Sequence, residues 1–153
     1  MYTVIKKQGR APVTIQRGTL LGVMCKKRVI LIEDDSTTAF AIRKMLDNLG
    51  YAVIEIFTSA EDALDRIPSL SPDIIIMDIT LKGAMNGIEA AEIINKNHGT
   101  PIIYLTGNTN YDTIHKARET TKSYGYLLKP VRGMDLHWTI NTALKRHQLE
   151  NSR

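Results

Sequence analysis

Short apolar runs alternate with longer amphipathic stretches along the chain from residue 28 onward. Several runs are apolar almost throughout, which fits strands that are buried on both faces of a parallel sheet. The stretches between them repeat apolar residues at helical spacing. This alternation predicts five βα units that form an α/β fold, a doubly wound five-stranded parallel sheet in a three-layer sandwich. The expected strands are 29–33, 52–57, 74–79, 101–106 and 125–128, and the expected helices are 36–48, 59–67, 87–97, 110–122 and 133–149.

Local signals set some of these boundaries. Ser59 is a capping residue followed by two acids, which favours a helix start at that point. Pro68 and Pro72 lie where the same helix is expected to end. The last helix carries Leu136, Ile140 and Leu144 on one face, and we expect Trp138 to contribute to packing.

Residues 1–27 do not follow this pattern. Segments 13–15 and 20–24 could each form a short strand, but glycine and proline interrupt any longer element. The segment carries a charge of +6 without any acid, whereas residues 28–153 hold 14 basic and 16 acidic residues. We therefore divide the chain into a basic N-terminal extension, residues 1–27, and one domain, residues 28–150. The favoured interpretation of the extension is a solvated segment rather than a nucleic-acid or lipid contact.

Composition narrows the class further. Cys25 is the only cysteine, which excludes a disulfide framework and a cysteine metal cluster and fits a reducing compartment. No apolar stretch is long enough to span a bilayer. The sequence therefore predicts a cytoplasmic protein without a membrane span.

Chemically active side chains gather where the expected strands end. In a parallel sheet of this kind, the carboxyl ends of the strands form the functional edge. Several carboxylates that converge there would repel one another, so a hard cation with oxygen ligands, Mg²⁺ or Mn²⁺, is expected. The residues at the strand ends are Glu33, Asp34, Asp35, Asp78, Thr106 and Lys129.

Asp78 is best placed to act as a nucleophile, because it stands alone at the end of the central apolar run "DIIIMD". A carboxylate beside a divalent ion and a lysine is suited to attack a phosphoryl group. Glu33 and Asp34 are suited to coordinating the ion. Asp35 is either a further ligand of the ion or only the first residue of the loop. The Thr106 hydroxyl can donate a hydrogen bond to a phosphoryl oxygen.

Residues 28–148 resemble the receiver domain of response regulators in two-component signalling, as in the chemotaxis regulators. The segments "VILIEDD", "IIIMDITL", "PIIYLTG" and "YGYLLKPV" carry the resemblance. It implies a flavodoxin-like (βα)5 fold, phosphorylation of Asp78, a switch made of Thr106 and Tyr126, and a lysine partner at Lys129. It also implies that the backbone carbonyl of Thr80 joins Glu33, Asp34 and Asp78 as a metal ligand, and that the bond before Pro130 is cis.

The loop after Asp78 departs from that family's usual pattern. Lys82 takes the place of a proline that many receivers have four residues after the acceptor. Gly87 falls nine residues after Asp78 rather than eight. We interpret this as a local rearrangement of the loop that preserves function.

The leading hypothesis is a stand-alone receiver that accepts a phosphoryl group from a sensor histidine kinase. Its chain has no expected DNA-binding domain, so signalling would pass through an unknown output protein or a homodimer made by the last two helices. The alternatives are a receiver-fold scaffold or dimerisation module that does not switch, and a magnesium phosphatase. The phosphatase is disfavoured because Thr80 stands where such enzymes carry a second aspartate, so we do not expect an enzyme with turnover beyond slow autodephosphorylation.

Overall fold

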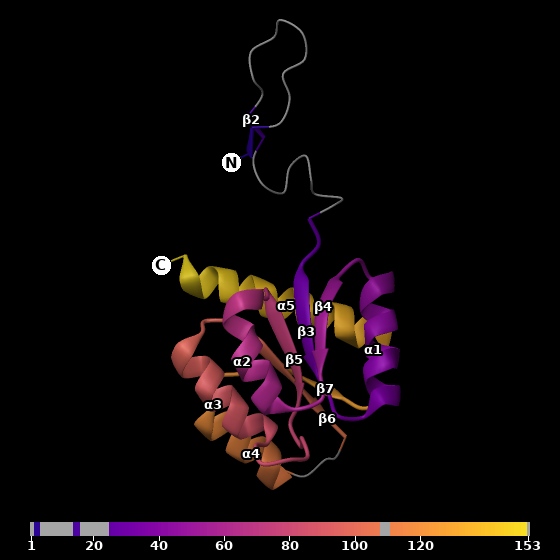
Figure 1. The fold of residues 1–153 in the computed structure, drawn as a ribbon, viewed down its shortest axis with the longest axis vertical. Coiled ribbons are helices and arrows are strands. Elements are labelled where there is room, and N and C mark those ends of the chain that lie inside the picture. Colours follow the sequence, from indigo (N-terminus) through magenta and orange to yellow (C-terminus); the bar gives the residue numbers. More distant parts are fainter. Residues whose placement is uncertain (1, 4–13, 16–24, 108–110, 153) are drawn as a thin grey trace, which may run out of the picture.

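The computed structural model describes residues 2–3, 14–15, 25–107 and 111–152. From residue 28 onward, five strands and five helices alternate along the described chain (Figure 1). The elements are β3 (Arg28–Ile32), α1 (Ser36–Asn48), β4 (Ala52–Phe57), α2 (Ala60–Leu70), β5 (Ile74–Asp78), α3 (Gly87–Asn97), β6 (Ile102–Thr106), α4 (Tyr111–Thr120), β7 (Gly125–Leu128) and α5 (Gly133–Asn151).

The five strands form one parallel sheet in the order β4-β3-β5-β6-β7. After β4 the chain crosses to the other side of β3, so the direction in which strands are added reverses between β3 and β5. Ile32 pairs with Met77 across these two strands. The carboxyl ends of β3 and β5 therefore lie side by side at the switch point, where α/β sheets place their sites.

Helices cover both faces of the sheet, as the apolar pattern predicted (Figure 1). Alternate strand residues point to opposite faces, so β3 sends Ile30 and Ile32 into one core and Val29 and Leu31 into the other. The first core is closed by α2, α3 and α4, and the second by α1 and α5. The fold is the expected doubly wound, flavodoxin-like three-layer sandwich.

Near the N-terminus, β1 (Tyr2–Thr3) pairs antiparallel with β2 (Thr14–Ile15). Two residues of the expected strand 13–15 thus form β2, whereas segment 20–24 lies outside the described residues. In the described part of the chain, every helix is too short or too polar to cross a membrane.

Helix α2 corrects one sequence expectation. The helix was expected to end at residue 67, but it continues through Pro68 to Leu70. At its end, the N–H of the cap residue Ser71 donates to Ile67 O at 3.0 Å, and the Arg28 guanidinium donates to the last carbonyl, Leu70 O, at 2.6 Å. These contacts satisfy carbonyls of the last turn, which have no partner within a helix.

Helix α5 corrects another expectation. Trp138 does not pack in the core, because its side chain is 61% exposed. The buried face of α5 consists of Leu136, Ile140 and Ala143.

Candidate functional site

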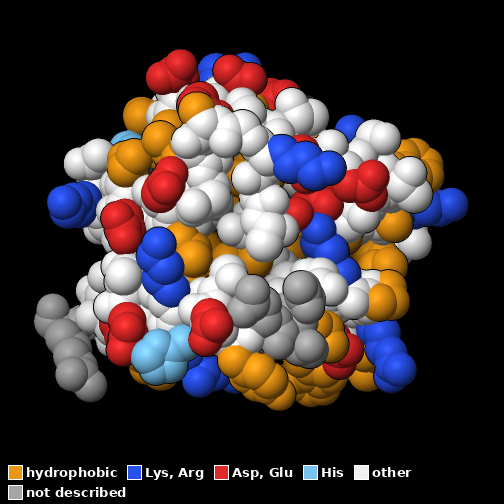
Figure 2. All heavy atoms as spheres, turned by 90° about the horizontal axis from the view of Figure 1, so that it is seen from below, with side chains coloured by type: hydrophobic (Ala, Val, Ile, Leu, Met, Phe, Trp, Pro, Cys, Tyr) orange, Lys and Arg blue, Asp and Glu red, His pale blue; other side chains and the backbone are white. Residues whose placement is uncertain are grey.

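Five of the predicted site residues lie at the carboxyl edge of the sheet. Figure 2 views the molecule from this end, where acidic and basic side chains lie next to one another. Each residue ends or directly follows a strand, so the topology alone brings them to one edge. Glu33 and Asp34 follow β3, Asp78 ends β5, Thr106 ends β6 and Lys129 follows β7.

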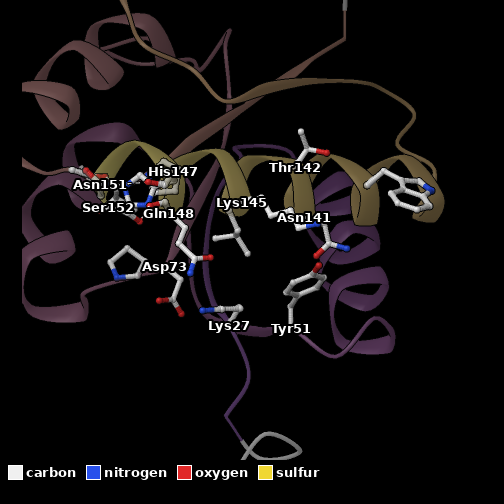
Figure 3. Close-up of a pocket in the computed structure, with 16 residues that line it drawn as sticks. Lys27, Tyr51, Asp73, Asn141, Thr142, Lys145, His147, Gln148, Asn151 and Ser152 are labelled. Atoms are coloured by element: carbon white, nitrogen blue, oxygen red, sulfur yellow. Dashed lines mark hydrogen bonds between the residues drawn. The ribbon is translucent and has the colours of Figure 1, made fainter. Parts of the chain in front are cut away.

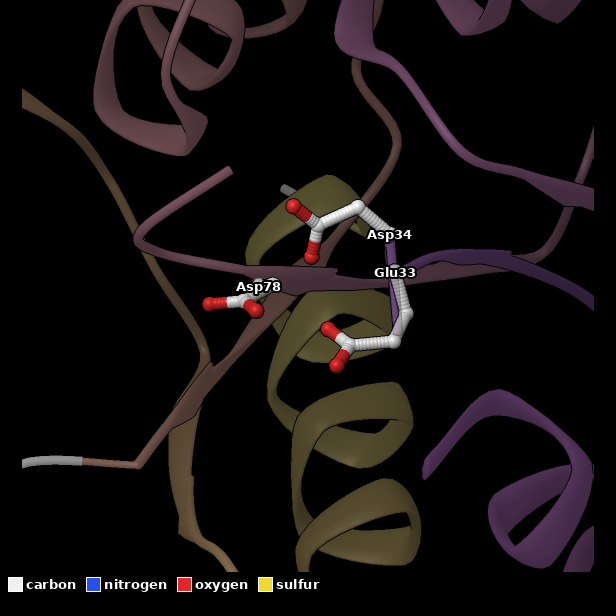
Figure 4. Close-up of side chains that lie close together, drawn as sticks. All are labelled: Glu33, Asp34 and Asp78. Atoms are coloured by element: carbon white, nitrogen blue, oxygen red, sulfur yellow. The ribbon is translucent and has the colours of Figure 1, made fainter. Parts of the chain in front are cut away.

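Three carboxylates form a compact acidic cluster, defined by Glu33, Asp34 and Asp78 (Figure 4). One oxygen from each lies within 4.8 Å of the other two. Glu33 is 1% exposed and Asp78 is 3% exposed, so two of the three are removed from bulk water. Buried carboxylates this close repel one another unless a cation or a proton intervenes.

Lys129 supplies a cation to two members of the cluster. Its Nζ donates to Glu33 Oε1 at 2.7 Å and to Asp78 Oδ2 at 2.8 Å. The other oxygen of Glu33, Oε2, is buried and has no hydrogen-bond partner among the described residues. Because buried polar atoms are nearly always satisfied, this oxygen marks a place for an additional proton or cation.

The two buried carboxylates have opposite pKa shifts. Burial raises the pKa of Glu33 to about 7, and the adjacent Asp78 adds to the increase. Burial also acts against ionisation of Asp78, but its contacts with Glu33, Lys129 and Thr80 hold its pKa below the ordinary value. Without a metal ion, the site therefore favours the ionised form of Asp78 and the protonated form of Glu33.

Thr80 positions the Asp78 carboxylate from the other side. Its backbone N–H donates to Asp78 Oδ1 at 2.8 Å, and its hydroxyl donates to the same oxygen at 3.0 Å. An aspartate that accepts from the N–H two residues later forms an Asx turn, a signal that was available at this strand end. Sequence reasoning missed these two bonds, whereas the expected role of the Thr80 carbonyl as a metal ligand stays a prediction.

Asp34 and Asp35 have different roles in the structure. Asp34 Oδ2 accepts from the backbone N–H of Lys82 at 3.2 Å, which ties the loop after β5 to the acidic cluster. Asp35 instead caps α1, because its side chain accepts from Thr38 N at 2.9 Å. Asp35 is therefore a helix cap, which resolves the alternative that the sequence left open.

The loop after Asp78 folds back onto the end of β5. A Cβ on Gly87 would lie 2.2 Å from the carbonyl oxygen of Asp78 and 2.9 Å from the Cα of Ile79. Both contacts are to backbone, so only glycine fits at this close approach. The loop that leads to it uses Gly83 at φ +122°, and Asn86 and Glu89 form a capping box at the start of α3. The longer loop thus reaches the end of β5 through a specific backbone contact.

The predicted switch residues lie on neighbouring strands. Thr106 is 5% exposed, and its carbonyl accepts from Lys129 N at 2.8 Å. The ring of Tyr126 lies 5.6 Å from that of Tyr104 and 5.7 Å from the guanidinium of Arg118. The Tyr126 hydroxyl is buried and has no hydrogen-bond partner among the described residues. The Lys129–Pro130 peptide bond is cis, as expected.

The donor set indicates what the site can hold. Glu33, Asp34 and Asp78 offer oxygen ligands alone, which suits a hard cation such as Mg²⁺. The unsatisfied Glu33 Oε2 fits the same assignment. The ionised Asp78, bonded to Lys129, is the carboxylate best arranged for nucleophilic attack on an electron-poor centre.

Curated relatives match most of this chain. The transcriptional regulatory protein PdtaR of Mycobacterium tuberculosis (strain CDC 1551 / Oshkosh) is 29% identical over 120 residues, which are 78% of this chain and 58% of PdtaR. The DNA-binding response regulator MtrA of Mycolicibacterium paratuberculosis is 26% identical over 125 residues, 82% of this chain and 54% of MtrA. The chain thus spans little more than half the length of these relatives.

Solved structures and a family model agree with these matches. The signal receiver domain of a modulated diguanylate cyclase from Desulfovibrio desulfuricans G20 has a TM-score of 0.78 and 35% identity, covering 82% of this chain and 99% of that one. Residues 29–141 match the model of the response regulator receiver domain. With the fold and the edge that carries the acidic cluster, these matches show that the chain belongs to the family of response regulator receiver domains.

Proposed function

We propose that Asp78 accepts a phosphoryl group from the phosphohistidine of a sensor histidine kinase. The observation that carries the proposal is the setting of its carboxylate, which is 3% exposed and accepts hydrogen bonds from the Lys129 ammonium and from the Thr80 N–H. In the transfer, a carboxylate oxygen forms a bond to phosphorus while the bond from phosphorus to the histidine nitrogen breaks. The electron pair of that bond returns to the imidazole ring.

Glu33, Asp34, Asp78 and the backbone carbonyl of Thr80 would hold Mg²⁺, or Mn²⁺, beside the reacting group. The bound ion would neutralise charge on the transferred oxygens. Lys129 would keep an ion pair with a carboxylate of the acidic cluster. The Thr106 hydroxyl would donate a hydrogen bond to a phosphoryl oxygen. The acidic cluster and the orphaned Glu33 Oε2 support this assignment.

Phosphorylation would then act on the face formed by α4, β7 and α5. Movement of Thr106 toward the phosphoryl group would leave space near the Tyr126 ring, whose buried hydroxyl has no hydrogen bond to another described residue. Tyr111 and Leu128, on α4 and β7, are 82% and 57% exposed and offer an apolar contact for an output protein or a second copy. A change in the conformation of this face would alter its affinity for the partner and so transmit the signal.

Incubation with acetyl phosphate and Mg²⁺, followed by intact mass spectrometry, tests the proposal. We expect one phosphoryl group on the native protein and none on Asp78→Asn. Asp35→Asn is the matched control, because Asp35 caps α1 outside the acidic cluster, so it should be labelled like the native chain. Addition of EDTA should prevent labelling.

Two outcomes would contradict the proposal. Equal labelling of Asp78→Asn would place the modification elsewhere, and an unlabelled native protein would favour the scaffold that does not switch. If an output partner had the same affinity for the labelled and the unlabelled protein, the proposed switch would be contradicted, whereas phosphorylation of Asp78 would not.

A further inference from the structure

Lys82 lies in the loop after β5, beside the acidic cluster. Its backbone N–H donates to Asp34 Oδ2 at 3.2 Å. Its side chain is exposed and has no hydrogen-bond or ion-pair partner among the residues that the structure describes. The side chain is also not among the groups proposed to hold Mg²⁺ or the phosphoryl group. An ammonium group in this setting is available to an anion that enters the site.

Contacts on both sides of Lys82 fix its backbone. Leu81, the residue before it, is 5% exposed and packs in the core that α2, α3 and α4 close. Gly83, the residue after it, has φ +122°, a conformation that side chains other than glycine rarely adopt. The half-buried Met85 then packs against the same core. Because these anchors hold the loop, the Lys82 side chain extends from a fixed point at the rim of the site.

Distances within the acidic cluster bring Asp78 within reach of this side chain. Asp34, which binds Lys82 N, offers an oxygen that lies within 4.8 Å of an oxygen of Asp78 (Figure 4). Lysine carries its charge on a flexible four-carbon stem. A phosphoryl group bound to Asp78 would shorten the distance that remains, so its oxygens come within reach of the Lys82 ammonium.

The charge of Lys82 acts at this edge of the sheet. Hydrogen bonds from Thr38 make the largest contribution to the lowered pKa of Asp35, and the charges of Lys129 and Lys82 add to the decrease. Asp35 directly follows the acidic cluster in the chain. The positive field of Lys82 is therefore directed toward the carboxyl ends of the strands.

The charges of the site are one positive charge short once Asp78 is phosphorylated. With every carboxylate ionised, the acidic cluster carries three negative charges, and Lys129 and a bound divalent ion would supply three positive charges. A phosphoryl group carries about two negative charges near neutral pH, whereas the free Asp78 carboxylate carries one. The phosphorylated site would therefore have one negative charge in excess, which the Lys82 ammonium would neutralise.

We propose that Lys82 contacts the phosphoryl group from the loop after β5, as a second cation beside Lys129. The contact attracts an anionic phosphodonor as it enters and stabilises the phosphoryl group once it is bound to Asp78. The Lys82 ammonium forms no covalent bond and transfers no proton. This inference rests on the proposed function, because it assigns the same site a preference for donors with a fully charged phosphate end, such as small acyl phosphates.

The rate of labelling by acetyl phosphate with Mg²⁺, followed by intact mass spectrometry, tests this contact. At low ionic strength we expect Lys82→Ala to slow labelling by roughly twofold to fivefold, the range of an exposed ion pair. The difference should shrink in about 1 M salt, because the screening length falls to about 3 Å. Lys82→Arg keeps the charge and should retain most of the native rate.

Lys145→Ala is the matched control for this rate. It also removes an exposed lysine, but Lys145 lines a cavity at the amino ends of the strands, away from the acidic cluster (Figure 3). We expect it to be labelled like the native chain. Labelling of Lys145→Ala that is as slow as that of Lys82→Ala would show an effect of net charge alone and would overturn the proposal.

Thermal midpoints distinguish the loss of a charge from damage to the loop. Lys82→Ala keeps the backbone N–H that binds Asp34. Mg²⁺ should therefore raise its midpoint at least as much as that of the native chain, since the removed charge repels the ion. Beryllofluoride, which binds an aspartate carboxylate in place of a phosphoryl group, should raise the midpoint of Lys82→Ala less. Smaller effects of both ligands in this variant would assign Lys82 a structural role and overturn the proposal.

These two measurements also separate this inference from the proposed function. Equal labelling rates of the native chain and Lys82→Ala at every salt concentration would overturn the inference, whereas phosphorylation of Asp78 would stand. A native protein that is not labelled, but that beryllofluoride stabilises more than it stabilises Lys82→Ala, would contradict the proposed function alone. A native protein on which neither reagent acts would overturn both.

Discussion

At the scale of single residues, the ammonium group of Lys129 holds two buried carboxylates in place. Its bonds of 2.7 and 2.8 Å reach Glu33 and Asp78, which belong to different strand ends. The sequence predicted that these residues meet, because each one ends or follows a strand. It did not predict which carboxylate carries the proton, since that depends on burial and on distances between oxygens.

We expect Lys129→Met to destabilise the metal-free protein. The substitution leaves Glu33 and Asp78 buried without their cation, and breaking such a pair from one side costs about 3–5 kcal/mol in the free energy of unfolding. Urea denaturation in the presence of EDTA measures this change. Lys145→Met is the control, because Lys145 is exposed and should change the free energy by less than about 0.5 kcal/mol. Equal effects of both substitutions would contradict this account of the site.

Stability should also depend on pH through Glu33. The pKa of this group is about 7 in the folded protein and 4.5 ordinarily, so the folded state binds more protons between these values. The contribution of Glu33 to metal-free stability is therefore complete below pH 4.5 and is lost as pH rises through about 7. The lowered pKa of Asp78 acts only at more acidic pH.

A Mg²⁺ ion bound as proposed would displace the Glu33 proton, so its stabilising effect should grow as that proton is lost. We expect the ion to raise the thermal midpoint more at pH 8 than at pH 6, as measured by differential scanning calorimetry. In Glu33→Gln this pH dependence of the metal effect should disappear. A metal effect in the native protein that is the same at both pH values would argue against a shared proton on Glu33.

At the scale of elements, apolar periodicity predicted all five strands and five helices of the domain. The strand boundaries differ by one residue or less. Buried apolar runs mark β3, β5 and β6, whereas β4 and β7 are largely half-buried. The end of α2 was not predictable, since it depends on Arg28, a residue distant in sequence that binds Leu70 O. The exposure of Trp138 was likewise missed, because aromatic residues on a helix are usually packed.

The loop between β5 and α3 gives a prediction at the same scale. We expect Gly87→Ala to destabilise the protein by about 1–3 kcal/mol, because the added Cβ forces the backbone away from Asp78 and Ile79. Gly133→Ala is the control, since a Cβ added there would meet no atom within 4 Å and alanine favours the helix that begins at this residue. Thermal denaturation compares the two variants.

Acetyl phosphate labelling of Gly87→Ala adds a functional readout. The shifted carbonyl belongs to Asp78, so labelling should slow in this variant and remain unchanged in Gly133→Ala. A Gly87→Ala protein with native stability would show that the loop does not depend on this contact.

At the scale of the whole molecule, charge and chemistry are distributed unevenly. The acidic cluster lies at the carboxyl ends of the strands, whereas residues 1–27 carry a charge of +6 and join the domain at the start of β3. The sequence predicted this division from composition alone. It could not place the cavity of about 1030 Å³ beside α5 (Figure 3), because α5 and the segments before the strands that line it come together only in the folded chain.

We expect residues 28–153 to fold and react without the extension. The two cores consist of residues from 29 to 143, so the fragment should keep a thermal midpoint within a few degrees of the full chain. Its net charge should change from +4 to −2, which moves it from cation-exchange to anion-exchange binding at pH 7. Calorimetry, ion exchange and acetyl phosphate labelling measure these outcomes. Loss of cooperative unfolding would instead assign the extension a structural role.

The contact between Gly87 and the end of β5 also bears on how such chains are compared. A search pattern that demands a fixed count of residues from aspartate to glycine would pass over this chain, because here the count is nine. The glycine is required by a distance of 2.2 Å to a carbonyl oxygen, which loops of different length can satisfy. An alignment should therefore place its gap between residues 79 and 86 and keep Asp78 and Gly87 in register with their counterparts.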